Sequence, residues 1–272
     1  MLKRKVDDYL IQWKNNPDRL PLVIKGARQI GKTFSVRNFA KNYKNYIEIN
    51  FITDPQFKTI FKNGYSPESI IKEITLLKPE WEFIPNETLI LFDEIQVFPD
   101  CTTCLKFFKL DGKYDVICSG SLLGINYNQI TSVSVGYKTD YEMYSLDFEE
   151  FLWAKGYKQE QIDGILEHMI NQTPFSELEY KVWMDNFMEY VTLGGMPRVV
   201  DMFITNKNYS GTLQEQRQIL KSYEDDITKF INIMKRPGFV ISAARPKTKG
   251  CVLMVKIHTN IYLCVFLLVL IS

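Results

Sequence analysis

The sequence contains few of the residues on which metal centres and disulfide frameworks depend. Only two histidines, His168 and His258, and five cysteines occur among its 272 residues. A structural zinc site takes four Cys or His ligands, and the Cys101-x-x-Cys104 pair lacks two further ligands near it. We therefore expect Cys101 and Cys104 to be ordinary helix residues. The absence of an even cysteine framework indicates a reducing compartment.

Neither an excess of charge nor a long hydrophobic run is present. The 33 Lys and Arg residues balance 32 Asp and Glu residues, so bulk charge gives no argument for binding nucleic acid or an acidic membrane. No apolar core follows the basic residues of segment 1–8, so we expect no secretory signal there. The closing apolar run, residues 261–271, is shorter than the ~20 residues that span a bilayer. We expect a cytoplasmic protein with no membrane partner.

The sequence does contain a phosphate-binding loop between a strand and a helix. Residues 21–25 are typical of a buried strand, and apolar residues between Phe34 and Tyr43 are spaced like one helix face. Between them lies a Gly-x-x-x-x-Gly-Lys-Thr octet, made of Gly26, Ala27, Arg28, Gln29, Ile30, Gly31, Lys32 and Thr33. In such a loop backbone N–H groups bind phosphate, the lysine reaches the β- and γ-phosphates, and the threonine ligates Mg²⁺. The octet predicts binding of ATP and Mg²⁺.

Strands and helices alternate over the first 145 residues. After the loop, apolar strand candidates occur at residues 46–51, 88–94 and 114–119. Helical segments are expected around residues 56–62, 67–78 and 101–110. This alternation predicts an α/β fold with a parallel sheet of the P-loop NTPase type, flanked by helices.

A mainly helical region is expected to follow the sheet. Its helices are predicted at residues 147–155, 159–170, 177–193 and 213–234. The Gly-Gly-Met-Pro sequence at residues 194–197 interrupts them and indicates a hinge or a sharp turn.

Two acidic residues end the strand at residues 88–94. Asp93 is placed where a second residue besides Thr33 would serve Mg²⁺, and Glu94 can orient the attacking water or accept its proton. Functional residues of parallel sheets lie at the carboxyl ends of strands, which supports both assignments. The Gln96 side chain could hydrogen-bond the water or the γ-phosphate. An ordinary surface position for this glutamine is an equally good alternative.

Other polar residues near the predicted site are less well determined. Ser119, at the end of the next strand, is the candidate sensor of the γ-phosphate, with Ser121 as a close rival. The side chain of Arg28 is expected outside the phosphate cradle or over the flank of the nucleotide. Arg198 is either a lid arginine that reaches the phosphates or a plain surface charge.

The chain resembles the prokaryotic AAA-family ATPases that carry a C-terminal DUF4143 domain. The matching stretches are residues 26–33, 46–51 with 54–55, 91–96, 119–124, 146–152, 194–197 and 223–229. The resemblance implies an AAA+-like sheet with ATPase activity. It implies that Gly31, Lys32 and Thr33 bind phosphate and Mg²⁺, and that Asp93 and Glu94 serve the metal and the water.

Members of that family usually continue into a second domain that resembles a nuclease. Because residues 237–272 do not match this continuation, we expect a truncated or frame-shifted product. A role in DNA processing therefore enters only by family analogy, and the protein partner and the oligomeric state stay open. The predicted division of the chain is an N-terminal helix 1–20, an ATPase core 21–145, a helical lid region 146–205, the start of a C-terminal domain 206–236 and an atypical tail 237–272.

Three functions are compatible with these residues. The first is an Mg-dependent ATPase that couples nucleotide state to a partner or to the expected C-terminal domain, and the Asp93-Glu94 pair favours it. The second is a nucleotide-gated interaction module with little turnover. The third is a P-loop kinase for a small molecule, against which the Asp93-Glu94 pair and the Gly-Gly turn argue mildly.

Overall fold

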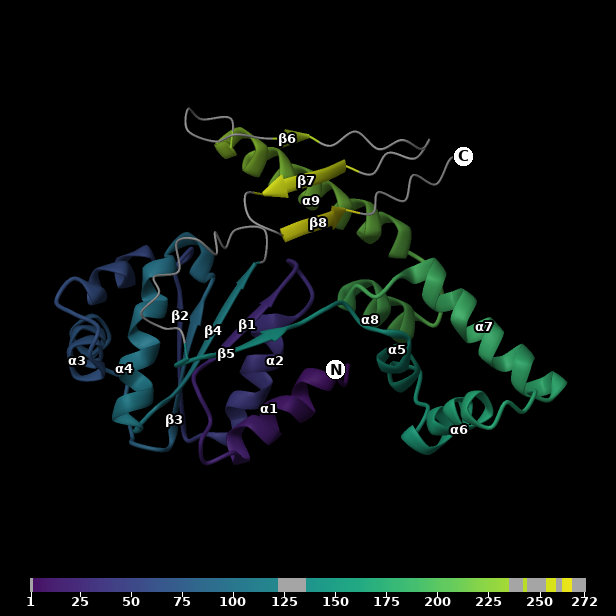
Figure 1. The fold of residues 1–272 in the computed structure, drawn as a ribbon, viewed down its shortest axis with the longest axis horizontal. Coiled ribbons are helices and arrows are strands. Elements are labelled where there is room, and N and C mark those ends of the chain that lie inside the picture. Colours follow the sequence, from purple (N-terminus) through teal and green to yellow (C-terminus); the bar gives the residue numbers. More distant parts are fainter. Residues whose placement is uncertain (1, 122–135, 235–241, 244–252, 258–260, 266–272) are drawn as a thin grey trace. The chain divides into compact units, whose positions relative to one another are not determined.

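The chain divides into two compact units, Met1–Lys221 and Ser222–Ser272. The computed structural model describes residues 2–121, 136–234, 242–243, 253–257 and 261–265. The first unit contains the sheet and most of the helices (Figure 1), and helix α9, Thr212–Met234, begins in the first unit and ends in the second. The candidate site lies in the first unit.

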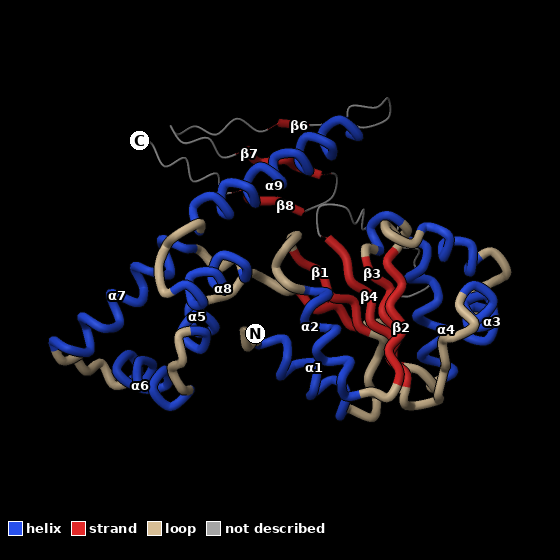
Figure 2. The backbone as a smooth tube through the Cα atoms, turned by 180° about the vertical axis from the view of Figure 1, so that it is seen from behind, coloured by secondary structure: helices blue, strands red, loops and turns tan. Residues whose placement is uncertain are grey.

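A five-stranded sheet forms the centre of the first unit. Its strands are β1 (Leu22–Gly26), β2 (Asn45–Asn50), β3 (Thr88–Asp93), β4 (Asp115–Ser121) and β5 (Thr139–Glu142). They lie in the order β2-β3-β4-β1-β5, and every neighbouring pair is parallel. Figure 2 shows strands β1 to β4 side by side. This confirms the predicted parallel α/β sheet, and it places β1 between two neighbours.

Helices cover both faces of this sheet (Figures 1 and 2). Alternate residues of each strand point to opposite faces. Leu22 and Ile24 of β1 pack with α1 (Lys5–Asn15) and α2 (Lys32–Phe39). Val23 packs on the other face, in the cluster formed by α3 (Pro67–Leu77) and α4 (Cys104–Asp111). Burial on both faces explains why the strands are nearly continuous apolar runs.

Short 3₁₀ segments make several of the connections. They are η1 (Ala40–Asn42), η2 (Pro55–Phe61), η3 (Ile95–Val97) and η4 (Pro99–Thr103). The helix predicted around residues 56–62 is therefore the 3₁₀ segment η2, in which Phe57 N–H donates to the Asp54 carbonyl and Lys62 N–H to the Thr59 carbonyl. The helix predicted from residue 101 begins as η4 and becomes α-helical only at Cys104.

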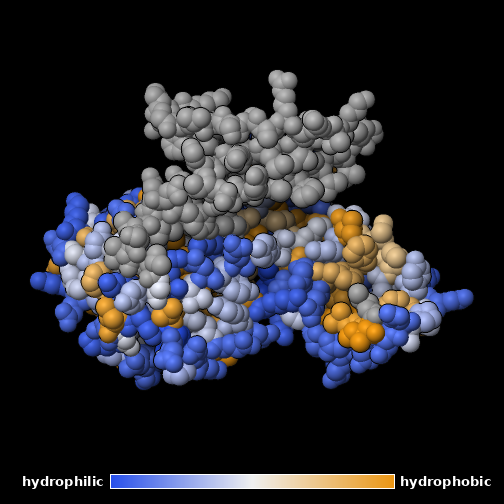
Figure 3. Space-filling view, in the orientation of Figure 1, coloured by the Kyte–Doolittle hydropathy of each residue, from blue (hydrophilic) through white to orange (hydrophobic). Residues whose placement is uncertain are grey.

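A helical region follows β5, as predicted. It consists of α5 (Phe148–Ala154), α6 (Gln159–Ile170), α7 (Glu177–Leu193) and α8 (Pro197–Asn206). Helix α8 and strand β5 are absent from the sequence prediction. Figure 3 shows hydrophobic residues on the surface of this region, at the right of the view. Exposed apolar side chains on α6 and α7 include Leu166, Ile170, Met184, Met188 and Val191. The helical region is thus less completely packed than the sheet.

The second unit contains the end of α9 and three short strands. β6 (Ser242–Ala243), β7 (Leu253–Ile257) and β8 (Ile261–Val265) form an antiparallel sheet in the order β6-β7-β8. The remainder of the atypical tail lies outside the described residues. The division between Lys221 and Ser222 coincides with none of the predicted domain limits, and those limits stay predictions. No helix in the described part of the chain is long and apolar enough to cross a membrane.

Candidate nucleotide-binding site

The phosphate-binding loop leaves the carboxyl end of β1 and begins α2, as the sequence predicts. Ala27 and Arg28 are half-buried, Gln29 is exposed and Ile30 is buried. Gly31 caps α2 with a φ of 94°, a left-handed conformation that favours glycine. A Cβ on Gly26 would lie 2.2 Å from the Met143 carbonyl oxygen. The two glycines are therefore needed for different reasons, a positive φ at Gly31 and close backbone approach at Gly26.

The Lys32 side chain folds back over this loop. Its Nζ donates to the carbonyl oxygens of Gly26 at 3.1 Å and Ala27 at 2.6 Å. Burial lowers the pKa of Lys32, although the carboxylates of Glu94 and Asp93 oppose this shift. The ammonium group thus lies within the loop and near both acidic residues.

Thr33 and Asp93 come together across the site. The Thr33 hydroxyl donates to Oδ2 of Asp93 at 2.9 Å, although the two residues are 60 positions apart in the chain. Asp93 is 2% exposed and also accepts from the Asn50 amide at 3.3 Å and from the Glu94 N–H at 2.9 Å. A buried carboxylate beside a hydroxyl provides the oxygen ligands that Mg²⁺ prefers.

Glu94 is held by a residue that sequence reasoning could not place. Its backbone is left-handed, with a φ of 57°, and its carboxylate accepts a hydrogen bond from the Gln96 side-chain amide. The Gln96 carbonyl oxygen accepts from the Ser121 N–H of β4 at 3.1 Å. Gln96 therefore bridges Glu94 and the carboxyl end of β4.

The two candidate sensor serines lie at different positions along strand β4. Ser119 pairs with Ile24 in the interior of β1, whereas Ser121 pairs with Gly26, where the loop begins. The Ser119 hydroxyl is fully buried and has no hydrogen-bond partner among the described residues. Ser121 is thus closer to the loop in register. The rest of the 119–124 motif lies outside the described residues.

Arg198 is the second residue of α8 and follows Pro197, which lies beside the loop. A Cβ on Gly31 would be 4.0 Å from Cγ of Pro197, the residue before it. The Arg198 side chain is 72% exposed, and its Nε lies 3.0 Å from Oε1 of Glu215 in α9. The other candidate arginine, Arg28, lies close enough to Lys32 for its positive charge to contribute to the lowered pKa of the Lys32 ammonium.

The site also contains residues that the sequence analysis missed. Asn50 ends β2 beside Asp93, and the rule that functional residues follow parallel strands could have identified it. Arg4 donates to the Ile30 carbonyl from 26 residues away, a contact for which the sequence holds no signal. The site thus receives side chains from β2, β3 and the N-terminus in addition to the loop.

Cys101 and Cys104 lie elsewhere, in the core between α4 and the sheet. Both are free and fully buried, and burial raises the pKa of each thiol. Within the described ranges no cluster of three or more His, Cys, Asp or Glu side chains could hold a metal ion. His258 lies outside those ranges.

Residues 18–152 match the sequence model of a family described as the AAA domain. This stretch contains the phosphate-binding loop and all five strands of the parallel sheet. The parallel sheet and the match together give this part of the chain the fold of a P-loop NTPase of the AAA type. They confirm the AAA part of the predicted resemblance.

Several solved structures are similar to the chain at low identity. The Walker-type ATPase PABY2304 of Pyrococcus abyssi is 14% identical, with 88% of this chain and 77% of that chain covered and a TM-score of 0.45. Drosophila ORC bound to DNA is 14% identical, with 82% and 66% covered and a TM-score of 0.42. PCH-2 of C. elegans is 11% identical, with 64% and 48% covered and a TM-score of 0.35. No curated protein sequence matches the chain.

Proposed function

We propose that the chain binds ATP together with Mg²⁺ and hydrolyses it, and that nucleotide state is passed to a partner or to a further domain. The observation that carries this proposal is the contact between Thr33 and Asp93 directly beside the loop lysine. It joins the loop to the acidic end of β3, as hydrolysis of a Mg²⁺–nucleotide complex requires.

Thr33 and Asp93 are the residues that would hold the metal. Both offer oxygen atoms, and the carboxylate is buried and hydrogen-bonded, which fits a hard divalent cation. When bound, Mg²⁺ supplies charge neutralisation at the phosphates. Residues 26–33 would bind the phosphates, with Lys32 exchanging its two loop carbonyls for phosphate oxygens.

Glu94 is the proposed acceptor for the proton of the attacking water. Gln96 orients its carboxylate, and the Ser121 N–H in turn anchors Gln96. Ser121 is favoured over Ser119 as the residue facing the γ-phosphate, because the register puts it opposite Gly26. Arg198 follows Pro197, which lies beside the loop, and is the proposed lid arginine once its side chain leaves Glu215.

Nucleotide binding is tested with Lys32→Ala. We expect this variant to lose binding of a fluorescent ATP analogue in the presence of MgCl₂. Lys62→Ala, at an exposed lysine on the surface, is the matched control and should bind like the parent. Equal affinity of Lys32→Ala and the parent would refute the proposal.

Turnover is tested with Glu94→Gln. Phosphate release should collapse while ATP binding persists, because the amide keeps the hydrogen bonding but cannot accept the proton. Near-zero phosphate release in both parent and variant would instead support the nucleotide-gated interaction module. Transfer of phosphate to a small molecule rather than to water would support the kinase. The DUF4143 domain and the truncation stay predictions, and the partner and the oligomeric state stay open.

A further inference from the structure

We propose that Arg4 is a positioning residue, which holds the phosphate-binding loop in its binding conformation and ties the loop to helix α5. The proposal rests on the proposed ATP binding. Arg4 lies 22 positions before the loop in the chain, but its side chain reaches the loop in the folded protein.

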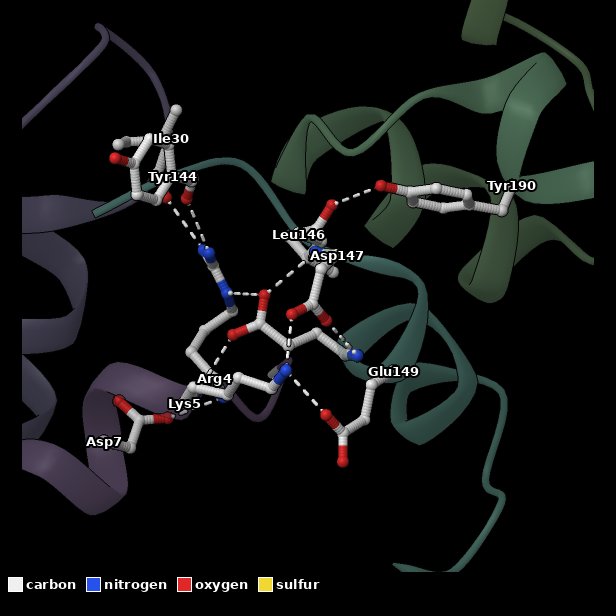
Figure 4. Close-up of polar contacts among 10 residues, drawn as sticks. Arg4, Lys5, Asp7, Ile30, Tyr144, Leu146, Asp147, Glu149 and Tyr190 are labelled. Atoms are coloured by element: carbon white, nitrogen blue, oxygen red, sulfur yellow. Dashed lines mark hydrogen bonds and ion pairs between the residues drawn. The ribbon is translucent and has the colours of Figure 1, made fainter. Parts of the chain in front are cut away.

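Arg4 bonds to two backbone segments at once. Its Nη1 donates to the Ile30 carbonyl at 2.9 Å, and its Nη2 donates to the Tyr144 carbonyl at 2.8 Å (Figure 4). The residue is 7% exposed. Tyr144 lies in the connection between β5 and α5. One guanidinium therefore joins the loop to the segment that leads into the helical region.

Glu150 completes this connection from α5. Its Oε2 lies 3.1 Å from Nε of Arg4, and both side chains are almost fully buried. The same carboxylate accepts from the N–H groups of Lys5 at 2.7 Å and Asp147 at 3.2 Å. Glu150 thus ties the first turn of α5 to the beginning of α1, and a charge in this position is costly to leave unpaired.

The bond to Ile30 matters because of where it acts in the loop. In a trans peptide the carbonyl and the following N–H point in opposite directions, and no cis peptide occurs in the described chain. When Arg4 fixes the Ile30 carbonyl on its own side, the Gly31 N–H must point away from Arg4. Arg4 thereby sets the direction of one backbone donor of the loop, the kind of group that binds phosphate. Gly31 needs such a constraint because its φ is 94°, and a glycine can leave this left-handed region without steric cost.

Two variants of Arg4 test this role, with Lys3→Met as the matched control. Lys3 is adjacent and basic but largely exposed. We expect Arg4→Met to raise the KM for ATP and the Kd of a fluorescent ATP analogue about tenfold, and to change kcat at saturating ATP by less than about threefold. Arg4→Lys keeps the charge and a donor, so it should recover part of the affinity. Lys3→Met should match the parent.

Glu150→Gln separates positioning from general stabilisation. It removes the buried counter-charge but leaves the Arg4 bond to Ile30, so it should lower the melting temperature while raising the Kd less than Arg4→Met does. An unchanged Kd and KM in folded Arg4→Met, judged by circular dichroism, would overturn the proposal. The proposal would also be overturned if Arg4→Met and Glu150→Gln raised the Kd in the same proportion to their loss of melting temperature, because the Kd would then report only stability.

Failure of the proposed function would look different. In that case the parent would bind ATP no better than Lys32→Ala. The link between Arg4 and α5 can then be tested without nucleotide, by comparing the melting temperatures of Arg4→Met, Glu150→Gln and the double variant. Additive effects of the two substitutions would overturn the link.

Discussion

The close backbone approach at Gly26 leads to a sharp prediction for Gly26→Ala. The added methyl group would lie 2.2 Å from the Met143 carbonyl oxygen and 2.5 Å from Cδ1 of Ile30. Met143 cannot yield easily, because its N–H donates to the Lys25 carbonyl at 2.7 Å. The Met143 backbone must move by about 1 Å to restore an ordinary contact.

The expected loss of stability follows from this displacement. Overpacking of a well-packed interior costs about 1–3 kcal/mol, which lowers the melting temperature of a domain of this size by about 2–12 °C. The affinity for ATP should fall as well, because the displaced segment lies against the beginning of the loop. Thermal unfolding by circular dichroism and titration with a fluorescent ATP analogue measure the two effects.

Gly164→Ala is the matched control for this substitution. Gly164 lies in α6, and a Cβ there meets nothing within 4 Å. Alanine should leave ATP binding unchanged and stabilise the helix by about 0.5–1 kcal/mol. If Gly26→Ala melted and bound ATP like the parent, the steric reasoning would be refuted.

Three further predictions concern other contacts. Hydrogen bonds from two lysines hold the pKa of Asp140 below its usual value against the effect of burial, and one of them, Lys25, is 3% exposed. A lowered folded-state pKa stabilises the protein above about pH 4, and this stability is lost at lower pH. Asp140 itself is 39% exposed, so solvent screens its charge. Asp140→Asn should therefore cost less than about 1 kcal/mol at pH 7 in urea unfolding and flatten the loss on acidification, whereas an unchanged acid dependence would contradict the assignment. Gln96→Ala should lower kcat about tenfold with a near-parental Kd for ATP, because Glu94 loses its orienting bond; an equal change in Kd would argue against that role. Burial raises the pKa of Cys101, so iodoacetamide should label it only as the protein unfolds, and rapid labelling of native protein in peptide mass spectra would disprove this.

The parts of the fold that the sequence predicts are those with local signals. The strand, loop and helix around Gly31 and Lys32 follow one another in the chain, and each has its own residue pattern. Asp93 ends a strand whose apolar run is visible in the sequence, and every residue of this strand is buried in the structure. In both cases the pattern and the structure involve the same few neighbouring residues.

The missed elements have weak local signals. Strand β5 has the sequence Thr-Asp-Tyr-Glu, is at the edge of the sheet and alternates between half-buried and exposed residues, so no apolar run marks it. Helix α8 is different, because the buried residues Val199, Val200 and Phe203 have helical spacing and a proline marks its start. This signal is present in the sequence, directly after the Gly-Gly turn that interrupts the predicted helices.

The choice between Ser119 and Ser121 shows a second limit. The two serines are two positions apart on one strand, and the residue pattern does not distinguish which of them faces the site. What distinguishes them is the register with β1, which places Ser121 and not Ser119 opposite Gly26. Register depends on pairing between segments almost a hundred residues apart, and a single sequence does not contain it.

The contacts between the loop and the helical region argue that these two parts respond together. A Cβ on Gly31 would lie 3.9 Å from Arg4 Nη1 and 4.0 Å from Cγ of Pro197, so both contacts converge on one residue of the loop. Arg4 leads to α5 through Glu150. Pro197 begins α8, and the Gly195 carbonyl before it accepts from the Leu146 N–H at 2.7 Å, just ahead of α5. The backbone at Gly31 is therefore linked to the helical region through Arg4 and through Pro197, and both links lead to the segment just ahead of α5. Because packed interiors shift as units rather than deform continuously, we expect a phosphate bound as proposed to move α5 and α8 together.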